Sequence, residues 1–436
     1  MSLNHTTKQE IAIHWFRRDL RLTDNAALSA ATNSGLKVLP IFIFDPHILD
    51  ELSRDDSRVS FIYNELQKID SNLQKVGSSL KIYHGKPIDI WRKIVDEFHV
   101  KKVFFNNDYE PYASERDKEI TQFLSSQNIE LQTFKDQVIF EKSEITKPNG
   151  LPYTVFTPFM KKWKEMFLSG IHDQDFEVKM SAFLQKNYPF QKLEDIGFKE
   201  STIKVKPFNL NQLDDYSELR NLPAEDGTSY LSPHLRFGTV SIRNLMRMIG
   251  NRHESFRNEL IWREFFMQIL YHFPHVANEN FKPQYNGIQW RNNAEEFERW
   301  CTGQTGFPIV DAGMRQLVST GYMHNRVRMI VASFLTKDLL IDWRWGEAFF
   351  AKHLLDFDLA SNNGNWQWAA GTGCDATPYF RVFNPDEQTK RFDPNLTYTR
   401  KWVTEMDEFS YPKPMVDHKF ARNRALETYK KGILKM

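Results

Sequence analysis

The 436-residue chain has few cysteines and no long hydrophobic run, and each absence excludes a class of protein. Its two cysteines, Cys301 and Cys374, are too few for a disulfide framework or a four-cysteine metal site, which fits a reducing compartment. No stretch approaches the roughly 20 continuous apolar residues that a membrane-spanning helix needs. The polar N-terminus lacks the pattern of a secretory signal. We therefore expect a cytoplasmic protein without a membrane span.

The chain also has almost no net charge, because 57 Lys and Arg residues balance 56 Asp and Glu residues. A surface that binds nucleic acid would therefore have to be a local basic patch. The glycine-rich signatures of dinucleotide and nucleoside triphosphate sites are missing. The histidines lack the spacing of metal ligands, so we expect no metal. What the sequence does have is tryptophan, since eight of the eleven tryptophans follow residue 200.

Short apolar runs alternate with amphipathic helical patterns between Ile11 and Asp136. The apolar runs read IAIHWF, VLPIFIFD, LKIYHG and VFFNND, and the helical patterns include PIDIWRKIVDEF. This alternation predicts a parallel sheet with helices on its faces. We expect an α/β domain with a Rossmann-like five-stranded sheet over residues 1–136.

The pattern changes twice after this domain. Residues 137–205 show no regular periodicity, and we interpret them as a long connector. Helical periodicity dominates beyond Pro207, as in the run SFRNELIWREFFMQILYHF. We therefore expect an all-α domain over residues 206–436.

Two segments of the helical region combine chemically useful groups. Gly227–Pro233 places hydroxyls before the expected helix start at Ser232, which suits a phosphate but is also an ordinary helix cap. Glu259 and Trp262 share one face of a helix, where they could bind and stack on a base. The alternative for Glu259 is a surface ion pair with Arg263 four residues on.

The segment LDFDLASNNGNWQWAA, residues 355–370, is the hardest to explain by structure alone. It holds two aspartates, several amides and two indoles among apolar or small residues. Burying such polar groups is costly unless each has a partner, so we expect a polar ligand here. The segment HNRVRM, residues 324–329, places Asn325 and Met329 on one helical face, although methionine at such spacing more often fills a core.

Read together and in order, these segments resemble the photolyase and cryptochrome family. The resemblance rests on HWFRRDLRLTDN, TSYLSP, NELIWREF, TGYMHNRVRMI, DLLIDWRWGE and FDLASNNGNWQWAAGTGCDATPYFRVFNP. It extends from about residue 11 to about residue 405 and is closest to class I cyclobutane pyrimidine dimer photolyases. It implies an α/β domain, a connector and a helical domain that binds FAD beside a cavity for DNA.

The resemblance implies which residues hold FAD. The positions that match the family's cofactor-binding residues are Tyr216, Thr228, Ser229, Tyr230, Leu231, Ser232, Asn325, Arg328, Asp356, Phe357, Asp358 and Asn362. Among them, Asn362 matches the residue that faces flavin N5. Photolyases typically have an asparagine there, whereas plant cryptochromes have an aspartate, so the resemblance favours repair.

The resemblance also implies a lesion site and a DNA-binding surface. Positions expected to act in catalysis are Glu259, Asn325, Met329 and Asn362, and positions expected to contact DNA are Glu259, Trp262, Arg326, Trp368 and Arg381. Met329 stands where photolyases for the (6-4) photoproduct have a histidine. The expected lesion is therefore the cyclobutane dimer.

The implied reaction is light-driven repair of pyrimidine dimers by a deoxyribodipyrimidine photo-lyase, a carbon–carbon lyase. Excited reduced FAD would pass an electron to the flipped-out dimer, the cyclobutane ring would split, and the electron would return. Glu259 would hydrogen-bond the dimer and stabilise its radical anion. Trp366, Trp343 and Trp290 match the chain that reduces oxidised FAD.

Three alternatives remain open at this stage. The protein could be a cryptochrome-type blue-light receptor, a DASH-type photolyase acting on single-stranded DNA, or a flavoprotein that merely binds nucleic acid. A second, antenna chromophore is a further expectation, with methenyltetrahydrofolate, a deazaflavin and a flavin as candidates. The match to the family's folate-contacting pair is partial, because Ser114 replaces its amide while Glu115 is retained. We expect DNA as the partner and a monomer.

Overall fold

The computed structural model describes residues 9–168, 170, 174–250 and 252–433. These residues form two compact units, which interleave along the chain. The sheet unit takes its described residues from 1–141, 165–205 and 233–250, and the helical unit takes its own from 142–164, 206–232 and 251–436. We describe each unit by itself.

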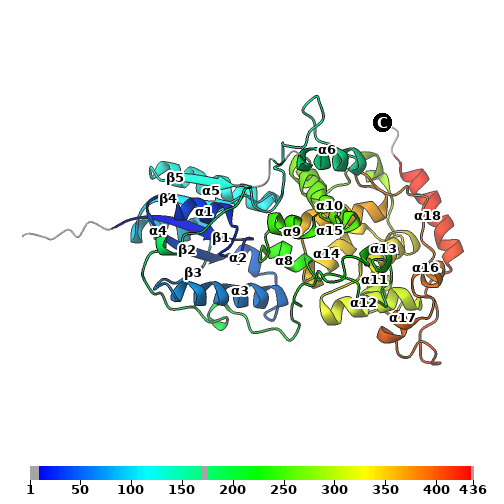
Figure 1. Ribbon diagram of the computed structural model, residues 1–436. Coiled ribbons are helices and arrows are strands. Elements are labelled where there is room, and N and C mark those ends of the chain that lie inside the picture. Colours follow the sequence, from blue (N-terminus) through cyan, green and yellow to red (C-terminus); the bar gives the residue numbers. More distant parts are fainter. Residues whose placement is uncertain (1–8, 169, 171–173, 251, 434–436) are drawn as a thin grey trace, which may run out of the picture. The chain divides into compact units, whose positions relative to one another are not determined.

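A five-stranded parallel sheet forms the centre of the sheet unit (Figure 1). Its strands are β1 (Glu10–Phe16), β2 (Lys37–Phe44), β3 (Lys81–His84), β4 (His99–Asn106) and β5 (Glu130–Phe134), in the order β3-β2-β1-β4-β5. All four pairings are parallel, and β1 aligns Ile11 with Lys37 and Phe16 with Phe42. The prediction of a parallel α/β domain is therefore confirmed.

Helices cover both faces of this sheet. The helices of the unit include α1 (Ala26–Thr32), α2 (Pro46–Leu49), α3 (Ser57–Gln74), α4 (Pro87–Glu97), α5 (Pro111–Ser126) and α9 (Ile242–Ile249), with short 3-10 turns at Met180–Ala182 and Glu194–Ile196. Apolar residues of α1 and α3 pack on one face and those of α4 and α5 on the other. Alternate strand residues supply both cores, as in parallel sheets generally.

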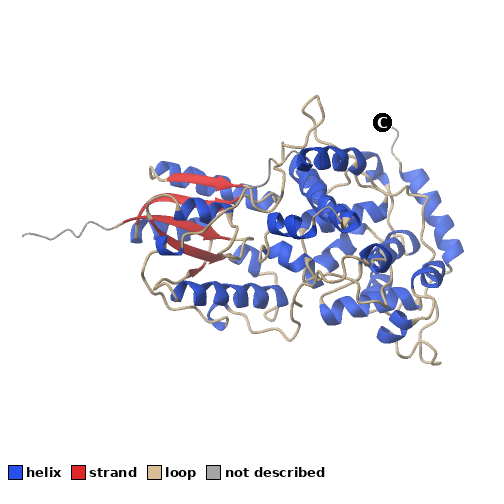
Figure 2. Ribbon diagram, in the orientation of Figure 1, coloured by secondary structure: helices blue, strands red, loops and turns tan. Residues whose placement is uncertain are grey.

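The helical unit holds most of the remaining helices (Figures 1 and 2). They are α7 (Tyr216–Leu219), α10 (Glu254–His272), α11 (Ala294–Cys301), α12 (Pro308–Thr320), α13 (Asn325–Ser333), α14 (Trp343–His353), α15 (Leu359–Ala370), α16 (Pro385–Phe392), α17 (Thr397–Trp402) and α18 (His418–Gly432). Short turns lie at Pro274–Ala277 and Pro283–Gly287, and a π-helical turn at Phe334–Asp338 follows α13 directly. The expected helical character of this part is confirmed.

Two helices cross from one unit to the other along the chain. They are α6 (Phe156–Leu168) and α8 (Ser232–Phe237). We expected no regular structure between residues 137 and 205, and this expectation is wrong for α6. Its signal is short, because only Phe156, Phe159 and Trp163 are buried, at a spacing of three and four residues.

Residues 233–250 belong to the sheet unit although they follow the predicted boundary at residue 205. Phe237 is buried in the core of the sheet unit, and its carbonyl accepts a hydrogen bond from the backbone N–H of Leu20 at 3.1 Å. The three contiguous segments that we predicted cannot describe a chain that passes back and forth between two units. The boundaries 1–136, 137–205 and 206–436 stay a prediction.

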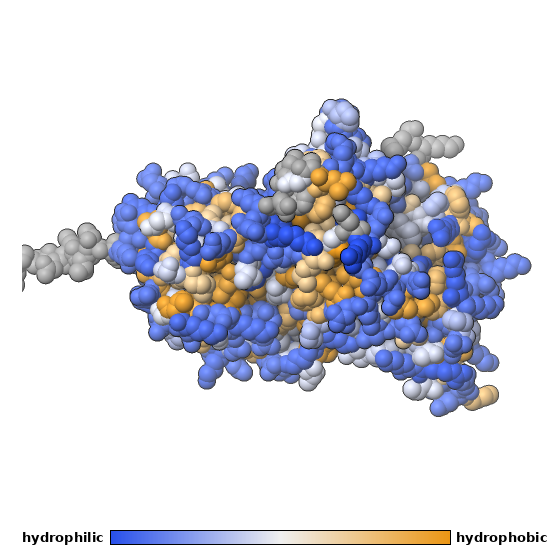
Figure 3. All heavy atoms as spheres, viewed as in Figure 1, coloured by the Kyte–Doolittle hydropathy of each residue, from blue (hydrophilic) through white to orange (hydrophobic). Residues whose placement is uncertain are grey.

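The core of the helical unit is rich in aromatic side chains. Trp300 and Trp343 are completely buried in it, with Trp366 beside them. Figure 3 shows hydrophilic residues over most of the visible face of each unit, with smaller apolar patches between them. In the part of the chain that the structure describes, none of the helices combines the length and the apolar content needed to cross a membrane.

Candidate active site

Helix α10 positions the first pair of predicted site residues. Glu259 and Trp262 lie three residues apart and are both partly exposed. The carboxylate of Glu259 forms an ion pair with the guanidinium of Arg220 at 2.7 Å. Arg220 caps the C-terminal end of helix α7, so the partner of Glu259 comes from a distant part of the sequence. Sequence reasoning considered only Arg263 as an ionic partner.

The indole of Trp262 lies in an aromatic stack. Its ring is almost parallel to that of Phe156, with centroids 3.6 Å apart and an interplanar angle of 7°. It also stacks on Phe266, with centroids 5.4 Å apart. Phe266 in turn packs on the bare backbone of Gly364 in α15, where an added Cβ would clash with the phenyl ring. The stack therefore fixes the orientation of Trp262.

Three residues predicted to bind a cofactor meet at one carboxylate. Asp356 accepts a hydrogen bond from the Ser232 hydroxyl at 2.7 Å and pairs with the Arg328 guanidinium at 3.0 Å. Arg328 also donates from Nε to the Met323 carbonyl at 2.8 Å, which fixes the guanidinium. The structure thus brings together residues that are 124 positions apart.

The segment before Ser232 has no regular secondary structure and contains a strained residue. Tyr230 has a positive φ of 52°, a conformation that non-glycine residues rarely adopt and that often marks functional sites. Thr228 and Ser229 are partly exposed, whereas Leu231 is buried. Hydroxyls and backbone groups are therefore held in an irregular, accessible loop.

Tyr216 begins α7 and packs edge-on against Phe256 of α10, with ring centroids 5.0 Å apart. Burial and the nearby carboxylate of Glu259 raise the pKa of Tyr216 to about 12. Its hydroxyl therefore stays protonated and can donate a hydrogen bond across the whole physiological range.

Helix α15 begins at an aspartate and carries a buried amide. Asp358 caps the helix by accepting a hydrogen bond from the Ser361 N–H at 3.1 Å. The side-chain amide of Asn362 donates from Nδ2 to the Glu347 backbone carbonyl at 3.0 Å and to its carboxyl Oε1 at 3.1 Å. Burial raises the pKa of Glu347 to about 7. Asn362 therefore touches a carboxyl group that titrates near neutral pH.

Two other polar residues of α15 have structural partners instead of a ligand. Asn363 and Gln367 both donate to the Val276 carbonyl, at 2.9 and 3.0 Å, and Gln367 donates to the Glu279 carbonyl at 3.1 Å. The inference that the polar density of residues 355–370 requires a ligand is wrong for these two side chains. These hydrogen bonds hold α15 against the turn after α10, and the two segments are far apart in the sequence.

Helix α13 presents Asn325, exposed at its first position, and Met329, partly buried one turn later. Between them, Arg326 donates to Asn221 at 2.6 Å and lies over the Phe392 ring. Burial lowers the pKa of Arg326, as do the charges of Arg391, Arg220 and Arg381. These four arginines are called the arginine cluster below.

The three tryptophans predicted to carry electrons share one core. Trp366 and Trp343 are buried in it and Trp290 packs against it. Trp366 lies on Gly346, one turn beyond Trp343 in α14. Trp290 packs edge-on against Tyr429, with centroids 5.7 Å apart. Nothing in their spacing along the chain indicated that these indoles are neighbours in one cluster.

Four further predicted residues, one of them a member of the arginine cluster, complete the set. Phe357 and Trp368 are partly exposed and pack against the core of the helical unit, and Arg381 is exposed. Glu115 lies exposed on α5 of the sheet unit. Arg236 of α8, which is not one of these four, pairs with Glu110 at 2.9 Å, and both residues belong to the sheet unit.

Sequence reasoning missed several residues that contact the candidate site. Arg220, Phe156 and Glu347 contact Glu259, Trp262 and Asn362 respectively. Arg220 and Phe156 come from other segments of the chain, and no local pattern marks their contacts. Glu347 had a weak signal, because a carboxylate in the aromatic helix WRWGEAFF is unusual.

Comparison with known proteins agrees with this arrangement. A family model described as the FAD binding domain of DNA photolyase matches residues 256–431, and one described as DNA photolyase matches residues 12–179. The deoxyribodipyrimidine photo-lyase of Synechococcus sp. is 35% identical, over 96% of each chain. This chain belongs to the DNA photolyase family.

Solved structures of the family resemble the fold closely. A bacterial class III photolyase from Agrobacterium tumefaciens has a TM-score of 0.86 at 36% identity, with 99% of each chain covered. An archaeal photolyase from Sulfolobus tokodaii, described with two FAD molecules and a novel light-harvesting cofactor, has a TM-score of 0.81 at 34% identity, covering 97% of this chain and 100% of that one. The assignment to class I stays a prediction.

Proposed function

We propose that this photolyase repairs cyclobutane pyrimidine dimers in DNA under light, with reduced FAD as its cofactor. The observation that carries the proposal is the composition of the helical unit. A carboxylate, an oriented indole and the arginine cluster occur in the region that matches the FAD-binding family. These are the groups that two neutral pyrimidine bases and a polyanionic backbone require.

The donor set of the helical unit fits a flavin nucleotide. The loop before Ser232 offers hydroxyls for phosphate oxygens, and the Arg328–Asp356 pair joins a cation to an acceptor for ribose or adenine groups. The amide oxygen of Asn258 in α10 is buried without a partner among the described residues. The residues proposed to hold FAD are Tyr216, Thr228, Ser229, Tyr230, Leu231, Ser232, Asn325, Arg328, Asp356, Phe357, Asp358 and Asn362. When bound and reduced, FAD supplies the light-excited electron that opens the cyclobutane ring.

Asn362 would offer a neutral hydrogen-bonding group to this cofactor. Because Nδ2 of Asn362 donates to Glu347, its Oδ1 atom would be the one to accept a hydrogen bond from the N–H at flavin N5. Protonated Glu347 adds no charge beside the flavin. Ionised Glu347 would place a negative charge one hydrogen bond away from Asn362. That charge would oppose any anionic form of the flavin.

Glu259 binds the dimer by accepting a hydrogen bond from an N–H of a pyrimidine base. The Arg220 guanidinium at 2.7 Å compensates the charge of this carboxylate, so extra electron density on the dimer does not face an isolated anion. Trp262, Trp368 and Met329 supply the apolar walls, and Asn325 supplies a further polar contact. Arg326 and Arg381 hold the DNA backbone.

Trp366, Trp343 and Trp290 deliver electrons when the cofactor is oxidised. Their indoles belong to one apolar cluster, from the buried Trp366 to the partly exposed Trp290. Each is a redox-active ring that packs against apolar neighbours. This series of three tryptophans activates the enzyme by reducing oxidised FAD and is separate from the repair step.

A second chromophore is proposed for the sheet unit, with methenyltetrahydrofolate, a deazaflavin and a flavin as the candidates. The description of the Sulfolobus tokodaii photolyase supports a light-harvesting cofactor in this family. Glu115 is the candidate contact because it is exposed on α5 and matches one member of the folate-contacting pair. Chromophore extraction and mass spectrometry of the purified protein would identify it.

We further propose that the protein works as a monomer in the cytoplasm. Size-exclusion chromatography with light scattering and cell fractionation test these two points. A stable dimer or a membrane-bound pool would contradict them.

The proposed function is tested with a thymine-dimer oligonucleotide and the reduced protein. Blue or near-ultraviolet light should restore intact thymines, while a dark control should show none. Duplex and single-stranded substrates are compared, because preference for the single strand would indicate a DASH-type enzyme. Absence of repair on both substrates with FAD bound would contradict the proposal.

A further inference from the structure

The segment before α6 forms a small hairpin with a fixed turn. Thr146 and Pro152 pair as an isolated antiparallel bridge, and the Lys147 N–H donates to the Leu151 carbonyl at 2.9 Å. Gly150 has a φ of 77°, and its N–H donates to the Lys147 carbonyl at 2.9 Å. Buried Ile145 anchors the start. The hairpin is therefore preformed.

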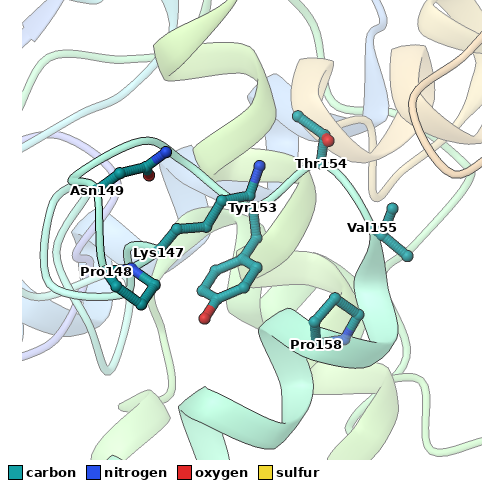
Figure 4. Close-up of a pocket in the computed structure, with 7 residues that line it drawn as sticks. All are labelled: Lys147, Pro148, Asn149, Tyr153, Thr154, Val155 and Pro158. Atoms are coloured by element: carbon teal, nitrogen blue, oxygen red, sulfur yellow. The ribbon is translucent and has the colours of Figure 1, made fainter.

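This hairpin and the start of α6 border an open pocket of about 460 Å³ (Figure 4). Its lining residues are Lys147, Pro148, Asn149, Tyr153, Thr154, Val155 and Pro158. In Figure 4 the Tyr153 ring lies at the centre, with Pro148 on one side and Pro158 on the other. The volume is within the range of roughly 300–1,000 Å³ that is common for small-molecule sites.

The pocket adjoins the residues proposed to receive the dimer. Val155 lines the pocket, and the next residue, Phe156, stacks on Trp262 at 3.6 Å. The Phe156 N–H donates to the Asp375 carboxylate at 3.0 Å, which fixes this junction. Tyr153 packs edge-on against buried Phe159, with ring centroids 6.5 Å apart. One set of packed rings therefore connects the pocket with Trp262.

The chemistry of the lining matches a nucleotide. A tyrosine ring between two prolines offers a surface on which any base can stack. The Asn149 amide can meet a base edge, and the partly exposed ammonium of Lys147 can meet a phosphate. We propose that this pocket binds the base of the nucleotide that directly flanks the dimer on the same strand. The inference rests on the proposed function and extends its substrate from the dimer to a neighbouring nucleotide.

The occupant is assigned to the dimer strand because of continuity. Consecutive residues lead from the pocket to the partner of Trp262, so the hairpin lies close to a dimer bound at Trp262 and to the nucleotides joined to that dimer. A dimer that has left the helix has no stacking partner on either side. The base beside it can therefore stack on Tyr153 in place of its lost neighbour.

The test measures dissociation constants of the FAD-loaded protein in the dark. The probes are a thymine-dimer dinucleotide and trinucleotides with one added nucleotide on the 5′ or the 3′ side, each with a base or as an abasic residue. In the wild-type protein, a base on one side should raise affinity about tenfold over the dinucleotide. The matching abasic probe should give less than about a third of that gain.

Three variants assign the gain to the pocket. Tyr153→Ala should remove the gain while leaving dinucleotide affinity unchanged, and Tyr153→Phe should keep it. Leu151→Ala is the matched control, because Leu151 is 56% exposed on the same hairpin and does not line the pocket. Unchanged dinucleotide affinity also shows that each variant is folded.

Two results would overturn the inference. One is an equal gain from the abasic probes, which would assign it to the phosphate alone. The other is equal behaviour of Tyr153→Ala and Leu151→Ala. In both cases repair of a longer dimer oligonucleotide under light would persist, so the proposed function would stand. If the wild-type protein neither bound nor repaired the dimer, both the proposed function and this inference would be contradicted.

Discussion

Glu347 changes its charge near neutral pH beside the proposed flavin site. Burial raises the pKa of its carboxyl from 4.5 to about 7, and the hydrogen bond from Asn362 opposes this only partly. The folded state therefore binds a proton more tightly than the unfolded state. The stabilising contribution of the neutral carboxyl is complete below about pH 4.5 and is lost as the pH rises through about 7.

Glu347→Gln should remove this dependence. The wild-type free energy of unfolding should fall by up to about 3 kcal/mol between pH 4.5 and pH 8 through this group, whereas the variant should lack that component. Denaturant unfolding of both proteins across this range measures the difference. The matched control is Glu279→Gln, at an exposed position of the same unit. Parallel pH curves for wild-type and Glu347→Gln would contradict the assignment.

Asp356 is the acceptor shared by Ser232 and Arg328, which makes it the central residue of the proposed nucleotide-binding loop. Asp356→Asn leaves the volume unchanged but removes the charge that holds Arg328. We expect FAD occupancy after purification to fall at least severalfold. The far-ultraviolet circular dichroism spectrum, which reports secondary structure, should change little. Flavin absorbance per protein measures it, with exposed Asp386→Asn as control. Equal occupancy in the two variants would contradict this role.

At the scale of elements, the contact of α14 with α15 positions both Asn362 and Trp366. Gly346 allows the two helices to approach, because the Trp366 ring occupies the space of a Cβ atom there. Asn362 on α15 reaches Glu347 on α14 across the same contact. Packing and the proposed flavin site therefore depend on one helix pair.

Gly346→Ala should disturb this pair although alanine favours helices. The added methyl group must displace Trp366, and overpacking of this kind costs about 1–3 kcal/mol. Chemical denaturation should show this loss, while Ala348→Ser, at an exposed position of α14, should stay within about 0.5 kcal/mol of wild type. A Gly346→Ala variant as stable as wild type would mean that the helices separate freely.

Elements with strong periodicity could be predicted from the sequence, and weak ones could not. The strand ELQTF and the helix FTPFMKKWKEMFL carry few buried residues, because β5 is an edge strand and α6 buries only one narrow side. Polar residues show the same limit. Asn362 and Asn363 are adjacent and chemically identical, yet one contacts Glu347 and the other a backbone carbonyl. Only the fold distinguishes a residue of the candidate site from a structural one.

At the scale of the whole molecule, charge is local although the net charge is only +1. The arginine cluster concentrates positive charge around Arg326, and its members come from three separate segments of the chain. The sequence indicated that a basic patch had to be local, and resemblance supplied Arg326 and Arg381. Arg220 and Arg391 joined them only in the folded chain.

The salt dependence of DNA binding should report this cluster. Arg326→Gln and Arg381→Gln should each reduce the slope of log affinity against log salt by about 0.9, the value for one lost phosphate contact on duplex DNA. Binding of a dimer-containing duplex at several salt concentrations measures the slopes. Arg92→Gln, at an exposed pair with Asp89 in the sheet unit, should leave the slope unchanged. Equal slopes in all variants would exclude the cluster from the DNA interface.

The most direct test of the account is the number of thymines restored per absorbed photon by the reduced protein, with Glu259→Gln beside wild type. Dimer binding is measured in the dark on the same samples. The account predicts light-dependent repair by the wild type, and a severalfold lower yield with dimer binding largely kept in Glu259→Gln. No repair by FAD-loaded, reduced wild-type protein would contradict it.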